Sequence, residues 1–233
     1  MKIRMLSSLC LLAGSILGGH AMAETIAVIG TGNVGGALGP EFAAQGHTIV
    51  YGSREPRRAD VMELVRRTGN GASAQQPAQA VIDADIVVLA VPGTAAISIA
   101  RGLGDLSGKI ILDPTNIISR EGGYPMHGLD GHDSNAAMIQ EAHPGASVVK
   151  AFNTLNFMQM VDPETAGGPI SIPLAGDDAQ AKAVIAELVE GMGLHAADVG
   201  PLGYAHVLEE MLAMWAYSIR SDNAYNYYLQ PMP

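Results

Sequence analysis

Three glycines near the start of the chain have the spacing of a nucleotide-binding turn. Gly30, Gly32 and Gly35 form a Gly-x-Gly-x-x-Gly pattern. The first glycine allows a tight turn, the second lets a phosphate approach the backbone, and the third lets a helix pack closely on the preceding strand. The free N–H groups at the start of such a helix attract an anion. The pattern therefore indicates a site for a nucleotide pyrophosphate.

This interpretation requires a strand before the glycines and a helix after them. The apolar run 25–29 has the length of a strand, a helical pattern follows the glycines, and a second strand is predicted at 47–52. Glycine-rich turns are common, so the spacing alone is a weak signal. The order strand, glycines, helix, strand favours nucleotide binding over an ordinary strand-to-helix turn.

The end of the second predicted strand indicates which nucleotide binds. An NAD site carries an Asp or Glu there, which accepts a hydrogen bond from the ribose 2′-hydroxyl. This chain has Ser53 and Arg54 instead, with further arginines up to Arg58. Guanidinium groups suit a dianionic 2′-phosphate, so the sequence predicts NADP. Glu55 is expected to point away or to pair with an arginine, and the alternative to phosphate binding is a solvated basic loop.

Alternating strand and helix patterns predict an α/β fold with a Rossmann-type doubly wound parallel sheet. Continuous apolar runs at 85–91 and 109–113 are typical of strands buried on both faces. Residues 122–133 are predicted to form a loop, and Ser134 to cap a helix that ends at Ala142. The predicted domains are a signal peptide at 1–23, an NADP-binding Rossmann domain at 24–155 and a small C-terminal α/β unit at 156–233.

The C-terminal unit is predicted to end in a long helix over 204–228. Its apolar stripe is more typical of a core or a dimer contact than of a cofactor site. The strand predicted at 170–175 contains Pro173, which places it at an edge or makes it irregular. The stripe consists of Leu208, Met211, Leu212, Trp215 and Ile219.

Ligands of such a sheet bind beyond the carboxyl ends of its strands. The nicotinamide is expected near the segments 91–93 and 151–154. Asn116, Asn153 and Thr154 follow strand ends and could orient an amide or a flat ring, or could serve local turns. Asp113 is expected to be a structural carboxylate bonded to nearby backbone. No catalytic acid or base is assigned, and hydride transfer needs little such chemistry because the cofactor supplies it.

A histidine-rich stretch raises the question of a metal site. His127, His132 and His143 lie near Asp130 and Asp133. Their spacing matches no specific ligand pattern, so the interpretation favours a solvated loop, and no metal is predicted.

Composition narrows the class of protein. The chain has 233 residues, is 48% hydrophobic and carries a formal net charge of −10. Such a charge argues against a nucleic-acid or anionic-membrane partner. Cys10 is the only cysteine and lies in the predicted signal peptide. Disulfides, thiol catalysis and cysteine-ligated metals are therefore not expected in the mature protein.

The first residues resemble a secretory signal peptide. Lys2 and Arg4 give a positive start, an apolar run follows, and Ala21-Met22-Ala23 is a small-x-small cleavage site. The run is too short and too glycine-rich to favour a membrane span. The sequence therefore predicts an exported, periplasmic protein that begins at Glu24. The alternative is a mis-assigned start codon and a cytoplasmic protein.

Several motifs together resemble the NADPH-dependent reductases of the deazaflavin coenzyme F420. Their Rossmann domain is similar to those of Steap metalloreductases and pyrroline-5-carboxylate reductases. The matching residues span about 25–217, nearly the whole mature chain. The motifs are Gly30-Thr31-Gly32-Asn33-Val34-Gly35, Tyr51-Gly52-Ser53-Arg54, Asp113-Pro114-Thr115-Asn116, Val149-Lys150-Ala151-Phe152-Asn153-Thr154, Ala175-Gly176-Asp177-Asp178 and Asp198-Val199-Gly200-Pro201-Leu202.

The resemblance implies roles for individual residues. Thr31, Gly32, Asn33 and Val34 would hold the pyrophosphate. It further implies hydride transfer between NADP and a deazaflavin or flavin as second substrate, in a homodimer. Ser53, Arg54 and Arg58 would hold the 2′-phosphate, and Val91 and Ala151 would line the nicotinamide.

Two other functions stay open at this point. One is an imine reductase like pyrroline-5-carboxylate reductase, although the C-terminal unit is short for the helical dimer domain which that reaction uses. The other is a non-catalytic module that senses NADP and regulates a partner.

Overall fold

The computed structural model describes residues 23–119, 126–127, 134–167, 170–219, 221 and 229. The predicted signal peptide up to residue 22 and residues 222–228 of the predicted last helix lie outside these described residues. Within the described part, no helix is both long and apolar enough to span a bilayer.

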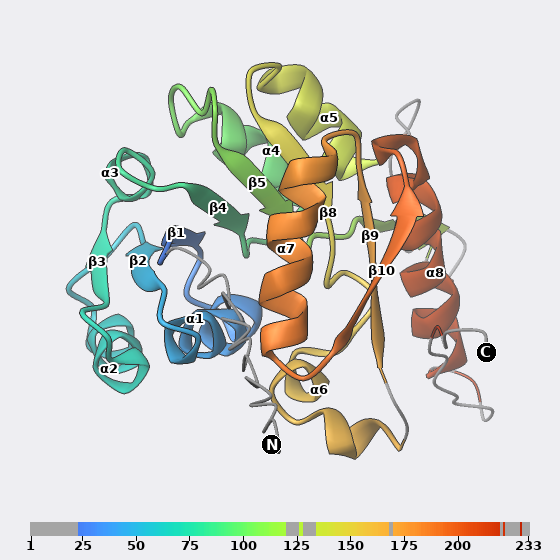
Figure 1. Cartoon of the computed structure of the whole chain (residues 1–233), viewed down its shortest axis with the longest axis horizontal. Coiled ribbons are helices and arrows are strands. Elements are labelled where there is room, and N and C mark those ends of the chain that lie inside the picture. The colour runs from blue at the N-terminus through green and yellow to red at the C-terminus, as the bar shows by residue number, and fades with distance from the viewer. Residues whose placement is uncertain are drawn as a thin grey trace, which may run out of the picture.

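Eight strands in the described residues form one sheet, which is the α/β core of the molecule. Their bounds are β1 (Thr25–Ile29), β2 (Thr48–Gly52), β3 (Ser73–Gln75), β4 (Ile86–Leu89), β5 (Ile110–Asp113), β8 (Ser147–Lys150), β9 (Ser171–Gly176) and β10 (His195–Gly200). The spatial order is β10-β9-β8-β5-β4-β1-β2-β3 (Figure 1). Neighbouring strands are parallel except β8 and β9, which are antiparallel. The strand order reverses between β1 and β4, where a Rossmann-type sheet binds its ligand.

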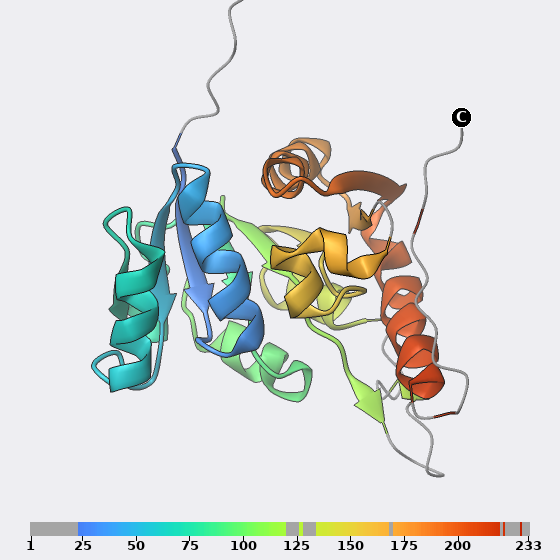
Figure 2. The same ribbon diagram turned by 90° about the horizontal axis from the view of Figure 1, so that it is seen from below.

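Helices cover both faces of this sheet. Their bounds are α1 (Asn33–Ala44), α2 (Ala59–Thr68), α3 (Pro77–Ala80), α4 (Gly93–Arg101), α5 (Asn135–Ala142), α6 (Phe157–Val161), α7 (Ala179–Gly191) and α8 (Ala205–Ser218), with 3-10 turns η2 (Pro163–Ala166) and η3 (Leu202–Tyr204). Residues of α1, α2, α6 and α7 pack in one core, and residues of α3, α4 and α5 pack in the other. Figures 1 and 2 show the resulting three layers.

The apolar strands supply both cores because side chains alternate along a strand. In β1, Ile26 and Val28 face one core, while Ala27 and Ile29 face the other. All four are buried. β4 and β5 alternate in the same way, with Val88 and Leu112 in one core and Val87 and Ile111 in the other. The prediction of strands buried on both faces at 85–91 and 109–113 is therefore confirmed, as is the doubly wound fold.

Two short strand pairings were not predicted. β3 adds an edge strand beside β2, although residues 73–75 show no strand pattern of their own. β6 (Ile118–Ser119) pairs antiparallel with β7 (Met126–His127), so the predicted loop 122–133 contains two residues of strand. The rest of that loop lies outside the described residues.

Of the two predictions for the strand that contains Pro173, the edge position is wrong, whereas an irregular strand agrees with its short pairing to β8. β9 lies between β8 and β10 in the strand order. Its antiparallel pairing with β8 joins only Val149 to Gly176 and Lys150 to Ala175. The ladder thus ends before Pro173, and the missing N–H of the proline disrupts no pairing with β8. β9 and β10 share one sheet with the predicted Rossmann domain, and the boundary between 155 and 156 stays a prediction from the sequence.

The last helix buries a different set of residues from the predicted stripe. α8 ends at Ser218, before the predicted end. Leu208 is buried as expected, whereas Ile219 is 50% exposed. The other buried residues of α8 are Ala205, Glu209, Ala213 and Ser218. A charged residue, Glu209, therefore lies on the packed face.

Candidate functional site

The glycine turn has the geometry that a bound pyrophosphate needs. Gly30 has a φ of +107°, which favours glycine, and its N–H donates to the carbonyl oxygen of Gly52 at 3.0 Å. A Cβ on Gly35 would lie 2.1 Å from the carbonyl oxygen of Gly30, so α1 contacts the turn directly. A Cβ on Gly32 would meet no protein atom within 4 Å. The backbone at Gly32 therefore faces open space that a phosphate can enter.

The start of α1 is open to an anion. The helix begins at Asn33 and has no acidic residue in its first turn. The first N–H groups of a helix lack partners within the helix. The side chain of Val34 packs against the core, so this residue offers its backbone to a ligand. A hollow of about 520 Å³ adjoins the turn and is lined by Thr31, Gly32, Asn33, Gly36, Ala37, Pro40, Glu41, Arg67, Phe157 and Val161.

The end of β2 carries the predicted 2′-phosphate residues. Ser53 is 8% exposed, and its Oγ accepts a hydrogen bond from the N–H of Glu55 at 3.2 Å. Arg54 is exposed, and its carbonyl oxygen accepts from Nε2 of Gln76 at 2.9 Å. No acid stands at the strand end itself. The geometry accordingly fits a phosphate ester better than a free ribose hydroxyl.

Arg58 is held by a carboxylate, a contact that was not predicted from the sequence. Its Nε and Nη2 donate to the two oxygens of Asp60 at 2.5 Å and 2.9 Å. These hydrogen bonds raise the pKa of the Arg58 guanidinium and lower the pKa of the Asp60 carboxyl. Glu55 forms no ion pair with an arginine of the described residues. A phosphate that recruits Arg58 must therefore compete with Asp60.

The turns after β4, β5 and β8 meet at the carboxyl ends of these parallel strands. Val91 follows β4 and is half-buried, whereas Ala151 follows β8 and is fully buried. A Cβ on Gly93 would lie 1.9 Å from the carbonyl oxygen of Asn116, which shows how closely the turns after β4 and β5 approach. The structure thus brings together the segments in which the sequence predicted the nicotinamide site.

Two predicted polar residues in these turns bind each other. Nδ2 of Asn116 donates to the carbonyl oxygen of Asn153 at 2.9 Å, and Nδ2 of Asn153 donates to Oδ1 of Asn116 at 3.0 Å. Nδ2 of Asn153 also donates to the carbonyl oxygen of Leu208 in α8 at 2.8 Å. The asparagines therefore connect the ends of β5 and β8 with α8. The alternative prediction, that they serve local turns only, does not account for these contacts.

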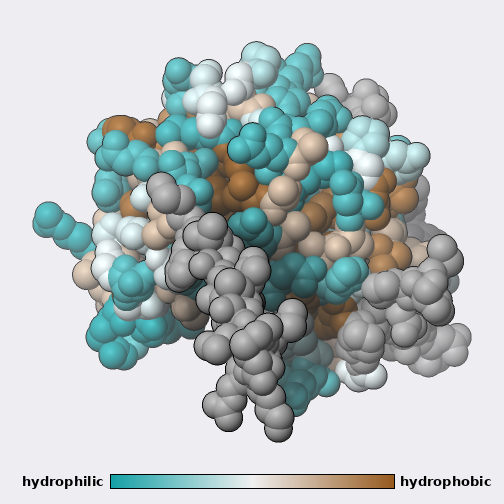
Figure 3. Space-filling model, viewed as in Figure 1, coloured by the Kyte–Doolittle hydropathy of each residue, from teal (hydrophilic) through white to brown (hydrophobic). Residues whose placement is uncertain are grey.

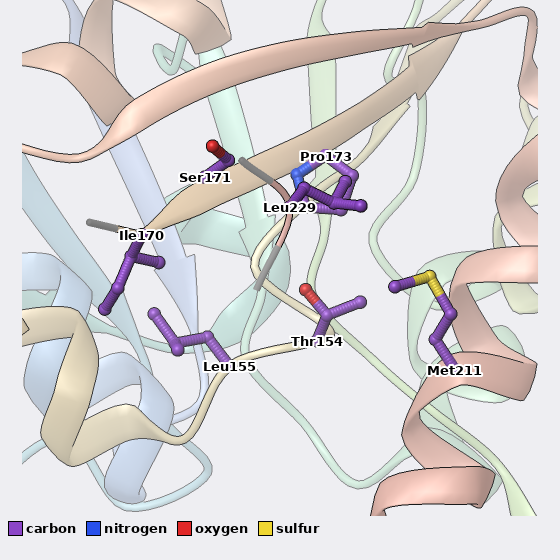
Figure 4. Close-up of a pocket in the computed structure, with 7 residues that line it drawn as sticks. All are labelled: Thr154, Leu155, Ile170, Ser171, Pro173, Met211 and Leu229. Carbon is purple, nitrogen blue, oxygen red and sulfur yellow. The ribbon is translucent and has the colours of Figure 1, made fainter. Parts of the chain in front are cut away.

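Thr154 lies apart from this pair, in a small pocket between β9 and α8. In Figure 4 its side chain faces Met211 across the pocket. The pocket has a volume of about 10 Å³, enough for about one water molecule. It therefore admits no ring in this conformation. Its lining consists of Thr154, Leu155, Ile170, Ser171, Pro173, Met211 and Leu229.

A buried charged cluster lies beneath these turns, and only one of its members, Asp113, was predicted to have a structural role. Oδ1 of Asp113 accepts from the N–H of Thr115 at 2.9 Å, as expected for a structural carboxylate. Its Oδ2 also accepts from Nζ of Lys150 at 3.0 Å, and Lys150 donates to Oε1 of Glu209 at 2.6 Å. The side chains of all three charged residues are 0% exposed. A lone lysine in an apolar strand was the signal that could have revealed the cluster.

The histidine-rich stretch is only partly described. Nε2 of His143 lies 3.0 Å from the carbonyl oxygen of Ala100. His132, Asp130, Asp133 and the side chain of His127 lie outside the described residues. Among the described residues, no three histidine, cysteine or acidic side chains are grouped as metal ligands would be.

Comparisons with known proteins identify the family of the chain. The profile of the family described as "NADP oxidoreductase coenzyme F420-dependent" matches residues 25–117. The F420-dependent NADP reductase of Methanothermobacter thermautotrophicus is 30% identical over 206 residues, which cover 82% of this chain and 87% of that protein. A crystal structure assigned to an F420-dependent NADP reductase from an Arthrobacter species is 31% identical, with a TM-score of 0.79, and covers 90% of this chain and 100% of that one.

A further relative shares part of its length only. The metalloreductase STEAP3 of Rattus norvegicus is 26% identical over 189 residues, and these cover 80% of this chain but 36% of that protein. The match to the Methanothermobacter reductase, in contrast, extends over most of both proteins. The chain belongs to the family of F420-dependent NADP reductases, which are NADP-dependent oxidoreductases.

Proposed function

We propose that this protein transfers hydride between NADPH and a flavin-like or deazaflavin-like acceptor of the F420 class. The observation that carries the proposal is the extent of the match to the Methanothermobacter reductase. It spans 82% of the chain. The match therefore extends beyond the nucleotide-binding half of the sheet. A likeness limited to the nucleotide half would support NADP binding alone.

The cofactor is held at two places in this proposal. Backbone N–H groups of residues 31–34 bind the pyrophosphate at the open start of α1. Ser53, Arg54 and Arg58 bind the 2′-phosphate, after Arg58 exchanges Asp60 for the ligand. Val91 lies beside the nicotinamide, and Ala151 supports it from within the core.

Positioning accounts for most of the chemistry that the chain must provide. NADPH, when bound, supplies the hydride, and the acceptor takes it up together with a proton. Asp113, Lys150 and Glu209 are fully buried, so none of them is placed to exchange a proton with a ligand. The turns instead carry neutral amides: Asn116 is half-buried, and the buried Asn153 holds it in place. Such fixed neutral groups suit the alignment of two flat rings.

Removal of the two arginines should abolish the preference for NADPH. We expect the double substitution Arg54→Ala and Arg58→Ala to weaken NADPH binding by roughly tenfold or more, because hydrogen bonds to a charged phosphate are lost. NADH binding should change little, since NADH has no 2′-phosphate. Titration of both nucleotides by calorimetry measures the two effects.

Two single substitutions serve as controls for this measurement. Arg66→Ala removes an arginine of α2 that pairs with Glu63, and NADPH binding should stay at the wild-type level. Asp60→Asn removes the carboxylate that competes for Arg58 and should tighten NADPH binding. An equal loss for NADPH and NADH in the double variant would refute the phosphate assignment.

Stopped-flow reduction by NADPH tests the acceptor. We expect rapid turnover with F420 or a related deazaflavin, observed by absorbance, and slower or no turnover with a cyclic imine. Turnover with the imine alone would favour the imine reductase. Tight NADPH binding without turnover of any acceptor would favour the NADP-sensing module.

We also propose that the protein is exported and begins at Glu24 after cleavage. β1 starts at Thr25, so cleavage after Ala23 removes no residue of the sheet. N-terminal sequencing of protein purified from cells should read from Glu24. A chain that retains Met1 would contradict export and support the cytoplasmic alternative. Substitution of Ala21 and Ala23 by leucine should block processing.

We propose in addition that the protein is a homodimer. Val207, Met214 and Tyr217 lie on one side of α8 and are 41%, 50% and 48% exposed. Apolar residues show along the right side of Figure 3, where α8 lies in the view of Figure 1. Sedimentation at micromolar concentration should show a dimer, and Met214→Glu should shift it to monomer because the charge would lie in an apolar interface. A wild-type monomer would overturn the proposal.

A further inference from the structure

Lys150 is the centre of a buried contact among three segments of the chain. Its Nζ donates to Oδ2 of Asp113 at 3.0 Å, to the carbonyl oxygen of Thr115 at 2.5 Å and to Oε1 of Glu209 at 2.6 Å. An ammonium group has three donors, and all three have acceptors here. The acceptors belong to the end of β5, the turn that follows it, and α8.

A charged cluster of this kind is not needed to fill space. Burial of an ammonium and two carboxylates is costly, and apolar residues of similar volume often give equal or greater stability. The remaining buried residues of α8 are mostly small or polar, apart from Leu208. The cluster therefore provides a directional link between this helix and the sheet.

The link continues from Glu209 to the turns at the carboxyl ends of the strands. Oε1 of Glu209 also accepts from the N–H of Asn135 at 3.0 Å. Nδ2 of Asn135 donates to the carbonyl oxygen of Gly93 at 3.1 Å and to Oγ1 of Thr115 at 2.8 Å. Glu209 is thereby connected to the turns after β4 and β5.

The neighbouring residue of α8 reaches the turn after β8. The carbonyl oxygen of Leu208 accepts from Nδ2 of Asn153, which is paired with Asn116. Two residues beyond Glu209, Met211 lines the small pocket with Thr154. A shift of α8 would therefore displace all the turns at which the nicotinamide and the acceptor are expected to meet.

We propose that Lys150 and Glu209 are positioning residues, and that their buried contact holds α8 and the turns 114–116 and 153–155 in register for the hydride acceptor. This inference rests on the proposed function. In the proposed function, the cofactor phosphates bind at the start of α1 and the end of β2. These elements lie on the far side of the point between β1 and β4 where the strand order reverses. The contact consequently affects the acceptor and the rate of transfer more than the affinity for NADPH.

Glu209→Leu tests the inference with the least risk to folding, because it leaves Lys150 and Asp113 as a neutral buried pair. We expect the KM for F420 to rise and kcat to fall, about tenfold or more in kcat/KM, while the Kd for NADPH changes by less than about twofold. Glu209→Gln keeps an acceptor oxygen for Lys150 and Asn135 and should restore most of the lost kcat/KM. Ile185→Val in α7 is the stability control, which should lower Tm and leave both ligands unaffected.

Hydrogen exchange separates failure of this inference from failure of the proposed function. In Glu209→Leu, amides of 115–116, 153–155 and α8 should exchange faster than in Glu209→Gln, whichever acceptor the enzyme uses. Unchanged exchange in these turns, or an equal loss of NADPH and F420 affinity, would overturn the inference. Absence of F420 turnover in the wild-type protein would overturn the proposed function, while the exchange data would still decide whether Glu209 holds the turns.

Discussion

Close backbone contact at the glycine turn is the constraint on which the rest of the site depends. Gly30 donates to Gly52 across the ends of β1 and β2, and a Cβ at this position would lie 2.1 Å from the carbonyl oxygen of Ala90 after β4. The ends of three strands are therefore held together without side chains between them. This contact places the start of α1 at the point where the strand order reverses, beside the turn after β4.

Electrostatics assign different tasks to the two sides. The chain has a formal net charge of −10, yet the end of β2 is free of acids and followed by arginines. The pair of Arg58 with Asp60 balances one of these positive charges. On the other side, the charges of Lys150, Asp113 and Glu209 are fully buried. The partly exposed polar side chain of Asn116 in these turns is neutral.

Local patterns in the sequence were sufficient for elements whose signals are contained in a few consecutive residues. β1, β4 and β5 are continuous apolar runs, and Ser134 caps α5 as predicted, with its Oγ accepting from the N–H of Ala137 at 3.0 Å. β3 was missed because its strand state comes from pairing with β2, which the sequence of 73–75 does not encode by itself. The cluster of Lys150 and Glu209 was missed for the same reason, since 59 positions separate the two residues.

Phe152 shows how the core and the site are joined. It has a φ of +62°, a conformation that side chains rarely adopt and that costs about 1–3 kcal/mol. Its ring is buried and packs edge-on against Phe42 of α1, with ring centroids 6.3 Å apart. The strained residue turns the chain between β8 and Asn153, while its ring anchors that turn to the helix that starts at the glycine turn. Core packing thus stabilises the backbone reversal, and one aromatic pair connects the helix that follows the glycine turn to the turn that contains the buried Asn153.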